Sequence, residues 1–582
     1  MSTITLAMIV RNEAHYLAAC LDSVKDHVDE IVIVDTGSTD HTLHIAAGYT
    51  DKIYPFPWQG NFSEARNYAI GQSTGEWILS LDADERLVCP TGHLKEILSR
   101  DPRIEAYMLP LDYQINEQTG EYNRFLVLRL FKNKKEYFFT GPIHEQVVIQ
   151  KKETVGQVDS LHIQHTPVSA QERNRKRGRN LTSLKKACAA NPEDPFLQYY
   201  LGVEWLGLGK PRRALPLLQK AYRHLTDEHI LVRAPALRYL LLCLNAMGRF
   251  DQTICLGQEA ALAYPDYTDI YYLTGLALSE KQEYKLAVKW LEQSVQCGVP
   301  PAYYSHMQGS GGFLAYYHKG YCHEKLGQEA EAKACYEKAL RENHRFFYPV
   351  GSLFLLLLRN QGARRAVDYF KGEKFFNHPP IALTLAEMLF ALGSPGMARE
   401  CLEGEVSTDS YEEILFQRGK YHIYCGDFRR GLIYFDLLPE NSIFLEKVYL
   451  HKALALWLSG AYQEGRELAL TLWKNPGLRP LAKVLLEISS RLQQDLTLEP
   501  KEHREGLEFT EASLLFDLCG RYLPDLPAVG CHHLKKLTGI LQNRLLGATG
   551  GVSWLDEYYK DKIQGIQECF HSRFGWVKWR HE

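Results

Sequence analysis

Several features that would assign this chain to a class at once are missing from its sequence. There is no run of about 18 apolar residues, so we expect no membrane-spanning helix. The short apolar run from Thr3 to Val10 leads into polar residues and does not resemble a signal peptide. The 13 cysteines are scattered without a Cys-x-x-Cys pair, which argues against a disulfide framework and against a zinc ribbon. A cytoplasmic protein is therefore expected.

A strong excess of charge of one sign is also missing. Lys and Arg number 67 against 70 Asp and Glu, which gives a formal net charge of -3. This balance argues against a general polyanion binder, so no nucleic-acid partner is expected. The hydrophobic fraction of 45% is that of a globular protein, and 582 residues are too many for a single ordinary domain.

Near its start the sequence contains four short apolar runs that each lead into polar residues. These runs end at Val10, Val34, Phe56 and Leu81, and helical patterns separate them. Such alternation predicts a mostly parallel α/β sheet. Because ligands of open α/β sheets bind beyond the carboxyl ends of the strands, the polar residues that follow the four runs should share one crevice.

Two carboxylates, Asp82 and Asp84, directly follow the fourth apolar run. With one residue between them on a turning backbone, both can face one hard cation, which one or two carboxylates and substrate phosphates typically hold. The alternative is an acidic turn without a ligand, because short motifs also match by chance. We take this pair as the first candidate for chemistry.

Two further candidates follow the second and third runs. Asp35 ends the second run and can accept hydrogen bonds from a nucleotide base or ribose, while Gly37 permits the tight turn that follows. Arg66 lies one turn into the next expected helix, where its guanidinium could pair with a diphosphate. The alternatives are that Asp35 only caps a helix and that Arg66 is solvated.

Four motifs in this order resemble those of family 2 glycosyltransferases of the GT-A fold. They occupy residues 8–13, 31–40, 61–67 and 75–85. More narrowly, the chain is similar to the bacterial branch of peptide and protein glycosyltransferases that carries tetratricopeptide repeats and includes the S-glycosyltransferase that modifies sublancin. The resemblance covers roughly the first 165 residues. It implies an α/β, Rossmann-like GT-A catalytic domain that uses a UDP-sugar as donor.

The resemblance also implies roles for individual residues. In the family the Asp35 position contacts the uridine base, and the Asp-x-Asp motif holds a divalent metal, Mn²⁺ or Mg²⁺, on the donor diphosphate. The physical argument agrees, because a divalent cation stabilises the charge of the departing UDP. Inversion at the anomeric carbon is implied by the family alone. The donor-binding residues expected are Val10, Arg11, Asn12, Glu13, Asp35, Gly37, Arg66, Asp82 and Ala83.

An acceptor hydroxyl, thiol or amide must lose a proton, which requires a carboxylate or an imidazole near the anomeric carbon. The motif from Gly141 to Glu145 supplies both groups, and the family has a similar Gly-x-Ile-His-Glu motif. We expect Glu145 to be the base or a group that orients the acceptor, with His144 as the second candidate. The alternative is a structural hydrogen-bonding pair at the start of a strand.

A third metal ligand is expected at His165. In the family a histidine followed by Tyr-Gly-Tyr occupies this place, whereas Thr166 and Pro167 follow it here. Mn²⁺ accepts an imidazole beside carboxylates, while Mg²⁺ prefers oxygen ligands. The alternative is a hydrogen-bonded core histidine. The expected metal ligands are Asp82, Asp84 and His165.

A basic run at residues 172–179 is interpreted as a solvated helix face, or as a surface that steers the anionic donor. Beyond it, helical patterns without strands predict tetratricopeptide repeats, whose turns recur at steps of 31 to 45 residues, around the usual period of 34. The longest step contains an insertion, Pro300 to Gly312, which is a candidate functional loop. The predicted turn residues are Gly209, Gly248, Gln282, Gly327, Gly362, Gly393, Gly426 and Gly460.

Four segments are therefore expected. Residues 1–168 form the GT-A domain, which closes with a hairpin around Gly156, and residues 169–190 form a basic helical linker. Residues 191–492 form an all-α solenoid of about eight repeats, whose concave surface suits a protein or peptide acceptor. Residues 493–582 form a helical cap or a segment for homodimerisation.

Two other functions stay open at this point. The acceptor could be a surface polysaccharide or a lipid-linked glycan, because one fold serves many acceptors. Alternatively, the chain could be a repeat scaffold whose transferase domain is inactive. The intact set of acidic and imidazole residues favours the enzyme. The identity of the sugar, the acceptor atom and the oligomeric state do not follow from the sequence.

Overall fold

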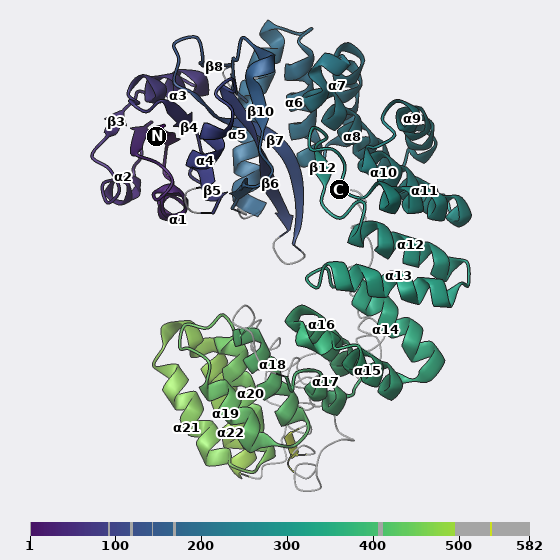
Figure 1. Cartoon of the computed structure of the whole chain (residues 1–582). Helices are drawn as coiled ribbons and strands as arrows, with labels where there is room; N and C mark the ends of the chain where they lie inside the picture. Colours follow the sequence, from purple (N-terminus) through teal and green to yellow (C-terminus); the bar gives the residue numbers. More distant parts are fainter. Residues whose placement is uncertain are drawn as a thin grey trace. The chain divides into compact units, whose positions relative to one another are not determined.

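A computed structural model of the chain describes residues 2–90, 93–116, 120–141, 144–166, 170–404 and 411–494, together with His533, Lys536 and Leu537 (Figure 1). It divides into two compact units, residues 1–346 (unit 1) and residues 347–582 (unit 2). The expected cap or dimerisation segment lies almost wholly outside the described residues and stays a prediction. No helix within the described ranges is long and apolar enough to cross a membrane.

Unit 1 begins with a sheet whose first half is parallel, as the sequence predicts. Its strands lie in the order β3, β2, β1, β4 and run in one direction, with helices between them. The strands are Ile4–Val10 (β1), Glu30–Asp35 (β2), Ile53–Pro55 (β3) and Trp77–Leu79 (β4). The helices are Leu17–Val24 (α1), Thr42–Ala46 (α2) and Phe62–Gly71 (α3).

The second half of the sheet is mixed, and its order continues as β7, β6, β11 and β5. The predicted hairpin between residues 146–150 and 160–164 is wrong, because β9 pairs with β8 and β11 runs parallel to β6. Gly156, expected in the turn, lies in β10, which also runs parallel to β6. The reason is the length of β6, because its 11 residues can pair with each short strand in turn. The elements are Glu85–Val88 (β5), His93–Arg100 (α4), Ala106–Asn116 (β6), Glu121–Lys132 (β7), Phe139–Thr140 (β8), Gln146–Val147 (β9), Val155–Gln157 (β10) and His162–His165 (β11).

The central strands of this sheet are buried on both faces, which limits the positions that polar residues can occupy. All residues of β1 are buried except Ile9, which is partly buried, and the last four residues of β2 are buried too. A strand covered on both faces tolerates few polar side chains along its length. The polar residues that follow β1, β2 and β4 are therefore concentrated at the carboxyl edge of the sheet, where the sequence places the crevice.

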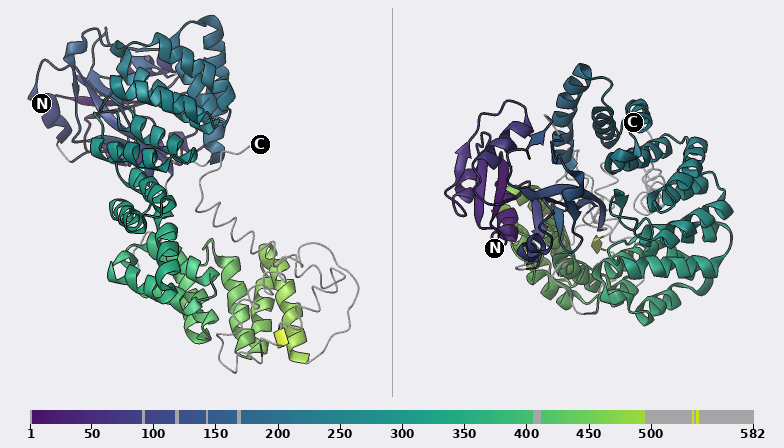
Figure 2. Two further views of the ribbon diagram at one scale, coloured as in Figure 1. Left: turned by 90° about the vertical axis from the view of Figure 1, so that its right-hand side faces the viewer. Right: turned by 45° about the horizontal axis from the view of Figure 1, so that its top comes forward.

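The rest of unit 1 consists of helices in antiparallel pairs, which follow one another in an arc that starts beside the sheet (Figure 2). The four turn residues predicted here, Gly209, Gly248, Gln282 and Gly327, all have positive φ angles, between 64° and 72°. The helices are Ala170–Ala190 (α5), Pro195–Gly207 (α6), Pro211–His224 (α7), Ile230–Ala246 (α8), Phe250–Ala263 (α9), Thr268–Glu280 (α10), Tyr284–Cys297 (α11), Phe313–Lys325 (α12) and Glu329–Glu342 (α13).

Unit 2 repeats the same helix-turn-helix pattern. Its four predicted turn residues, Gly362, Gly393, Gly426 and Gly460, have φ angles between 78° and 83°, a range that glycine adopts without a steric penalty. The helices are Tyr348–Gln361 (α14), Ala363–Gly372 (α15), Pro379–Ala391 (α16), Pro395–Cys401 (α17), Tyr411–Tyr424 (α18), Phe428–Asp436 (α19), Leu445–Leu458 (α20), Tyr462–Trp473 (α21) and Arg479–Gln494 (α22).

The insertion between α11 and α12 connects the repeats of unit 1 with the sheet. Its short strand His306–Met307 (β12) pairs antiparallel with β7. In this register His306 lies opposite Arg124, and Met307 lies opposite Asn123. The sheet therefore contains a strand that comes from the repeat region.

Buried polar side chains of two repeat helices hold this insertion in place. Asp269 of α10 is fully buried and accepts hydrogen bonds from the backbone amide of Met307 (2.9 Å) and the hydroxyl of Ser310 (2.6 Å). Arg238 of α8 lies 3.5 Å from the Asp269 carboxylate and donates a hydrogen bond of 3.1 Å to the side chain of Asn123 in β7. The two opposite charges are buried together, so removal of either one would leave the other uncompensated.

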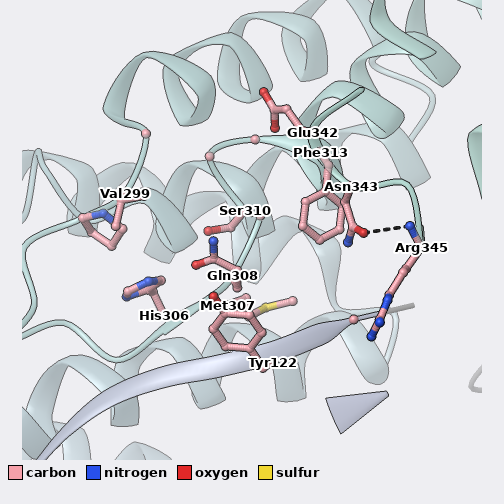
Figure 3. A pocket seen from close by; sticks show the side chains of 16 residues that line it. Tyr122, Val299, His306, Met307, Gln308, Ser310, Phe313, Glu342, Asn343 and Arg345 are labelled. Atoms are coloured by element: carbon pink, nitrogen blue, oxygen red, sulfur yellow. Dashed lines mark hydrogen bonds between the residues drawn. The ribbon is translucent and has the colours of Figure 1, made fainter. Parts of the chain in front are cut away.

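A cavity of about 640 Å³ lies where the insertion meets the start of β7 (Figure 3). Tyr122 of β7, Met307 and Phe313 contribute its apolar wall, and the glycine-rich turn at residues 309–312 contributes backbone. The backbone amide of Arg345 closes another side, where it donates to the Asn343 side chain at 3.0 Å. The insertion is therefore an ordered part of unit 1.

Candidate active site

The ends of β1 and β2 form one connected loop structure. Asn12 has a positive φ of 56°, and its side-chain oxygen accepts a hydrogen bond from the backbone amide of Thr39 at 2.7 Å. Asp35 is buried, and its carboxylate accepts from the backbone amides of Gly37 and Ser38, each at 3.1 Å. The residues expected to contact the nucleotide are therefore close together. The capping interpretation of Asp35 is wrong, because Asp35 binds the turn at Gly37 and Ser38, whereas the N-cap residue of α2 is His41.

Asp82 lies between two guanidinium groups at the end of β4. Arg66 of α3 donates to one carboxylate oxygen, and Arg129 of β7 donates to the other at 2.8 Å. Arg66 is only 5% exposed, so it belongs to the interior of the site and is not a solvated helix arginine. Burial alone would raise the pKa of Asp82, but the charges of Arg66 and Arg129 lower it. Asp82 is therefore held in its ionised form.

Glu85, the first residue of β5, completes this network. Its carboxylate accepts hydrogen bonds from the backbone amide of Asp82 at 2.9 Å and from Arg129 at 2.8 Å. Burial and the nearby negative charge of Asp82 raise the pKa of Glu85 to about 7, against the opposing charge of Arg129. Two acids and two arginines thus share one cluster, in which the Asp82 carboxylate is the more firmly ionised of the two acids.

Asp84 has different partners from Asp82. One of its oxygens lies 2.8 Å from the amino group of Lys176 in α5 and 3.4 Å from Nε2 of His165 in β11. The backbone of Asp84 also accepts a hydrogen bond from the amide of Thr166 at 2.7 Å. Burial disfavours the imidazolium form of His165, but the hydrogen bond and charge of Asp84 outweigh it and raise the pKa of His165. The structure therefore brings two of the three expected metal ligands together.

The third expected ligand, Asp82, is oriented toward the arginines. Within the described ranges, no group of three or more His, Cys, Asp or Glu side chains is arranged to hold a metal ion. Asp84 and His165 nevertheless offer one oxygen and one nitrogen donor side by side, a set that suits a borderline cation such as Mn²⁺. A metal on a nucleotide donor needs only one or two protein ligands, because phosphates and water supply the others. These residues therefore fit such an ion.

The Gly141–Glu145 motif reaches the same cluster from the other side. Glu145 accepts a hydrogen bond from Arg66, which therefore links it to Asp82. His144 has a positive φ of 52° and stacks on Tyr200 of α6, with ring centroids 4.0 Å apart and an interplanar angle of 7°. Burial lowers the pKa of His144, although the charges of Glu204 and Glu145 oppose this. His144 is therefore neutral near pH 7.

Nothing in the described part of the chain forms a hydrogen bond with Nε2 of His144, which is buried. The hydroxyl of Tyr200, in contrast, accepts a hydrogen bond of 3.3 Å from the side chain of Gln146. A buried polar nitrogen without a partner is costly in a fold that needs it only for packing. The His144 ring is thus positioned by a repeat helix, and its buried Nε2 has no hydrogen-bond partner among the described residues.

The basic run after the sheet is also part of the site. Besides the contact of Lys176 with Asp84, Arg177 and Asn180 of α5 both donate to the Glu204 carboxylate of α6, at 3.0 and 3.1 Å. The Arg179 guanidinium lies 5.6 Å from the centre of the Phe62 ring at the start of α3. Helix α5 therefore bridges the sheet and the first repeat, and the solvated-face interpretation does not describe Lys176 and Arg177, although Arg179 is exposed.

Three residues of the site have contacts that the sequence does not predict: Arg129, Lys176 and Tyr200. Arg129 stands inside an otherwise apolar run, where a charged residue is a signal of a buried ion pair. Lys176 has no local feature that separates it from its basic neighbours. Tyr200 follows the repeat pattern, which predicts core packing and gives no indication of the His144 ring.

Comparison with known proteins agrees with this geometry. Residues 5–149 match Glycosyl transferase family 2, and residues 314–343 match the tetratricopeptide repeat. The chain carries a family 2 glycosyltransferase domain. This domain contains every candidate donor-binding residue and both candidate bases, and the repeats follow it as the sequence predicts.

Three relatives show how far the likeness extends. A TPR repeat-containing protein of Synechococcus elongatus is 35% identical over 255 residues, 42% of this chain and 60% of that protein. The prophage-derived glycosyltransferase SunS of Bacillus subtilis is 28% identical over 299 residues, 49% of this chain and 68% of that protein. The lipopolysaccharide core biosynthesis glycosyltransferase LpsC of Rhizobium meliloti is 30% identical over 154 residues, 24% of this chain and 55% of that protein. Proteins with different names are thus similar to parts of this chain.

Proposed function

We propose that this chain transfers a sugar, with inversion, from a UDP-sugar to a side chain of a protein or peptide that the repeats recruit. One observation carries the proposal most directly: a repeat helix is part of the candidate active site, because Tyr200 of α6 stacks on His144. An acceptor bound along the repeats would therefore be delivered next to the catalytic residues. The likeness to SunS, which extends over 299 residues, supports the same conclusion.

The donor would bind at the carboxyl edge of the sheet. The loop around Asn12 and Asp35 supplies polar backbone and side-chain groups for the nucleoside. Asp84 and His165 would hold Mn²⁺ or Mg²⁺, which neutralises charge on the departing diphosphate when it is bound. The buried guanidinium groups of Arg66 and Arg129 fix Asp82 and add positive potential to the same place.

Two groups are candidates for removing the acceptor proton. Glu145, the first choice from the sequence, is engaged with the buried Arg66. Burial lowers the pKa of His144, so its neutral form can accept a proton near pH 7, and its buried Nε2 has no hydrogen-bond partner among the described residues. We therefore assign proton acceptance to His144 and assign Glu145 to holding Arg66. An acceptor must then approach the edge of the His144 ring, because Tyr200 covers one face.

UDP release from a panel of UDP-sugars, with Mn²⁺ or Mg²⁺ present or removed, tests this function. We expect release from one sugar that depends on the metal and falls about 100-fold or more in Asp84→Ala. Asp51→Ala is the matched control, because Asp51 is exposed just before β3, at the opposite edge of the sheet. Release that is equal in the wild type and in Asp84→Ala would show that the metal role is wrong.

A second acceptor class is supported by one relative. The LpsC protein is named for lipopolysaccharide core biosynthesis and matches 24% of this chain. A glycan acceptor would need the catalytic domain but not the concave surface of the later repeats. Transfer to a glycan acceptor that persists when the repeats of unit 2 are removed would favour this alternative. Transfer to a peptide that requires them would favour the first.

A further inference from the structure

The contact between Lys176 and Asp84 has a consequence for metal binding. The amino group is 2.8 Å from the carboxylate oxygen that also faces His165. The two side chains are 27% and 10% exposed, so solvent only partly screens their attraction. Lys176 thus places a positive charge at the carboxylate that a divalent cation would use.

We propose that Lys176 is an internal cation that a divalent metal must displace from Asp84, and that the released amino group then binds the donor diphosphate. This inference rests on the proposed function, because it assumes a nucleotide donor with a metal at the Asp-x-Asp motif. It assigns to Lys176 a positioning role in donor loading.

Displacement of Lys176 from Asp84 would cost free energy when the metal binds alone, but would be favourable when the metal binds together with the donor. When metal alone takes Asp84, the Lys176 amino group loses its contact with that carboxylate in a partly buried place, and the two cations lie close together. When the donor arrives as well, its diphosphate offers a new anionic partner beside the same carboxylate. An ammonium on a flexible four-carbon side chain can follow its partner over such a short distance. Metal and UDP should therefore each strengthen the binding of the other.

This arrangement predicts that replacing Lys176 changes the affinities for Mn²⁺ and for UDP in opposite directions. Lys176→Met keeps most of the length and the apolar part of the side chain but removes its charge. Mn²⁺ alone should bind more tightly, because no ammonium competes for Asp84. UDP alone, with chelator present, should bind more weakly, because the diphosphate loses a positive partner. A merely structural role for Lys176 would weaken both interactions or neither.

The experiment measures binding of Mn²⁺ and UDP to the full chain, by calorimetry and by the electron paramagnetic resonance of free Mn²⁺. In the wild type we expect each ligand to tighten the other by about 5- to 150-fold, the usual range of such coupling. In Lys176→Met this factor should fall toward one, with tighter Mn²⁺ and weaker UDP binding. The control is Lys186→Met, the same substitution at an exposed site farther along α5. When Asp84→Ala is added to both proteins, the wild type and Lys176→Met should no longer differ in their affinity for Mn²⁺.

Two results would overturn the inference, and they differ in meaning. If the wild type shows coupled binding and Lys176→Met keeps the same coupling factor, the role of Lys176 is wrong and the proposed function stands. If neither protein binds Mn²⁺ in the presence of UDP, the metal-dependent function is itself wrong, and the inference falls with it.

Discussion

The repeats of unit 1 and those of unit 2 share one pattern but bury different residues. In unit 1, Arg238 and Asp269 are 2% and 0% exposed, and they join the repeat helices to β7 and to the insertion. In unit 2, the polar side chains that are buried bind within the unit, as Trp457 does when it donates to Ser489 at 2.9 Å. The helical period thus predicts the stacked repeats in both units. Buried charged residues identify the repeats of unit 1 that also contact the sheet and the insertion.

The largest effect is expected from truncation of the chain to two fragments of different length. We expect residues 1–346 to unfold cooperatively and to bind UDP, because they contain one compact unit with its sheet and its first repeats. Residues 1–168 should fail to fold stably. They lose Lys176 and Tyr200 from the site and expose Phe62, which packs against the cluster of Leu181, Leu184 and Leu201. Circular dichroism melting and UDP binding measure both effects. Equal stability and UDP binding of the two fragments would contradict this view.

A smaller effect is expected from single substitutions, which should lower the stability of unit 1 more than that of unit 2. Asp269→Asn leaves Arg238 buried without its charged partner, which costs about 3 to 5 kcal/mol of the free energy of unfolding. Calorimetry of the full chain should show this loss in the transition of unit 1 alone. The matched control is Asp368→Asn in unit 2, which removes an exposed partner of Arg364 and should cost less than about 1 kcal/mol. Comparable losses from both variants would disprove the special role of the buried pair.

The smallest expected effect concerns the contact between the first repeat and the catalytic domain. Tyr200→Phe keeps the ring that stacks on His144 and loses only the hydrogen bond from Gln146, so kcat for UDP release should change little. Tyr200→Ala removes the stack, an interaction of about 0.5 to 1.5 kcal/mol, and should lower kcat about 2- to 13-fold without changing the KM for donor. Steady-state kinetics of both variants decide the matter. If both variants lower kcat equally, the stack does not position His144.

The sequence could predict those parts of the structure that depend on local rules. All eight turn residues have positive φ, because the repeat period locates them and glycine favours that conformation at seven of them. The strand ends at Val10, Asp35 and the Asp-x-Asp motif were also found, since buried parallel strands read as apolar runs.

The remaining parts depend on contacts between distant residues. The sequence does not predict the pairing of β10 with β6. Which strand pairs with which depends on how distant segments pack, and a local sequence pattern carries no information about that. The partners of Asp82 and Asp84 were missed for a similar reason, because Arg129 and Lys176 lie 47 and 92 residues away from them. The motifs thus identify residues of the site more readily than the contacts between them.

The pairing of β12 with β7 has a consequence for synthesis of the chain. Arg124 meets its partner His306 only after the ribosome has added every residue between them, because the two are opposite in the register. At roughly 5 to 20 residues per second this takes on the order of 10 to 35 seconds, far longer than the collapse of a small domain. During this interval of synthesis the sheet is therefore incomplete, because β7 has not yet paired with β12. Factors that bind nascent chains have their opportunity during that interval, before the repeats arrive and complete the unit.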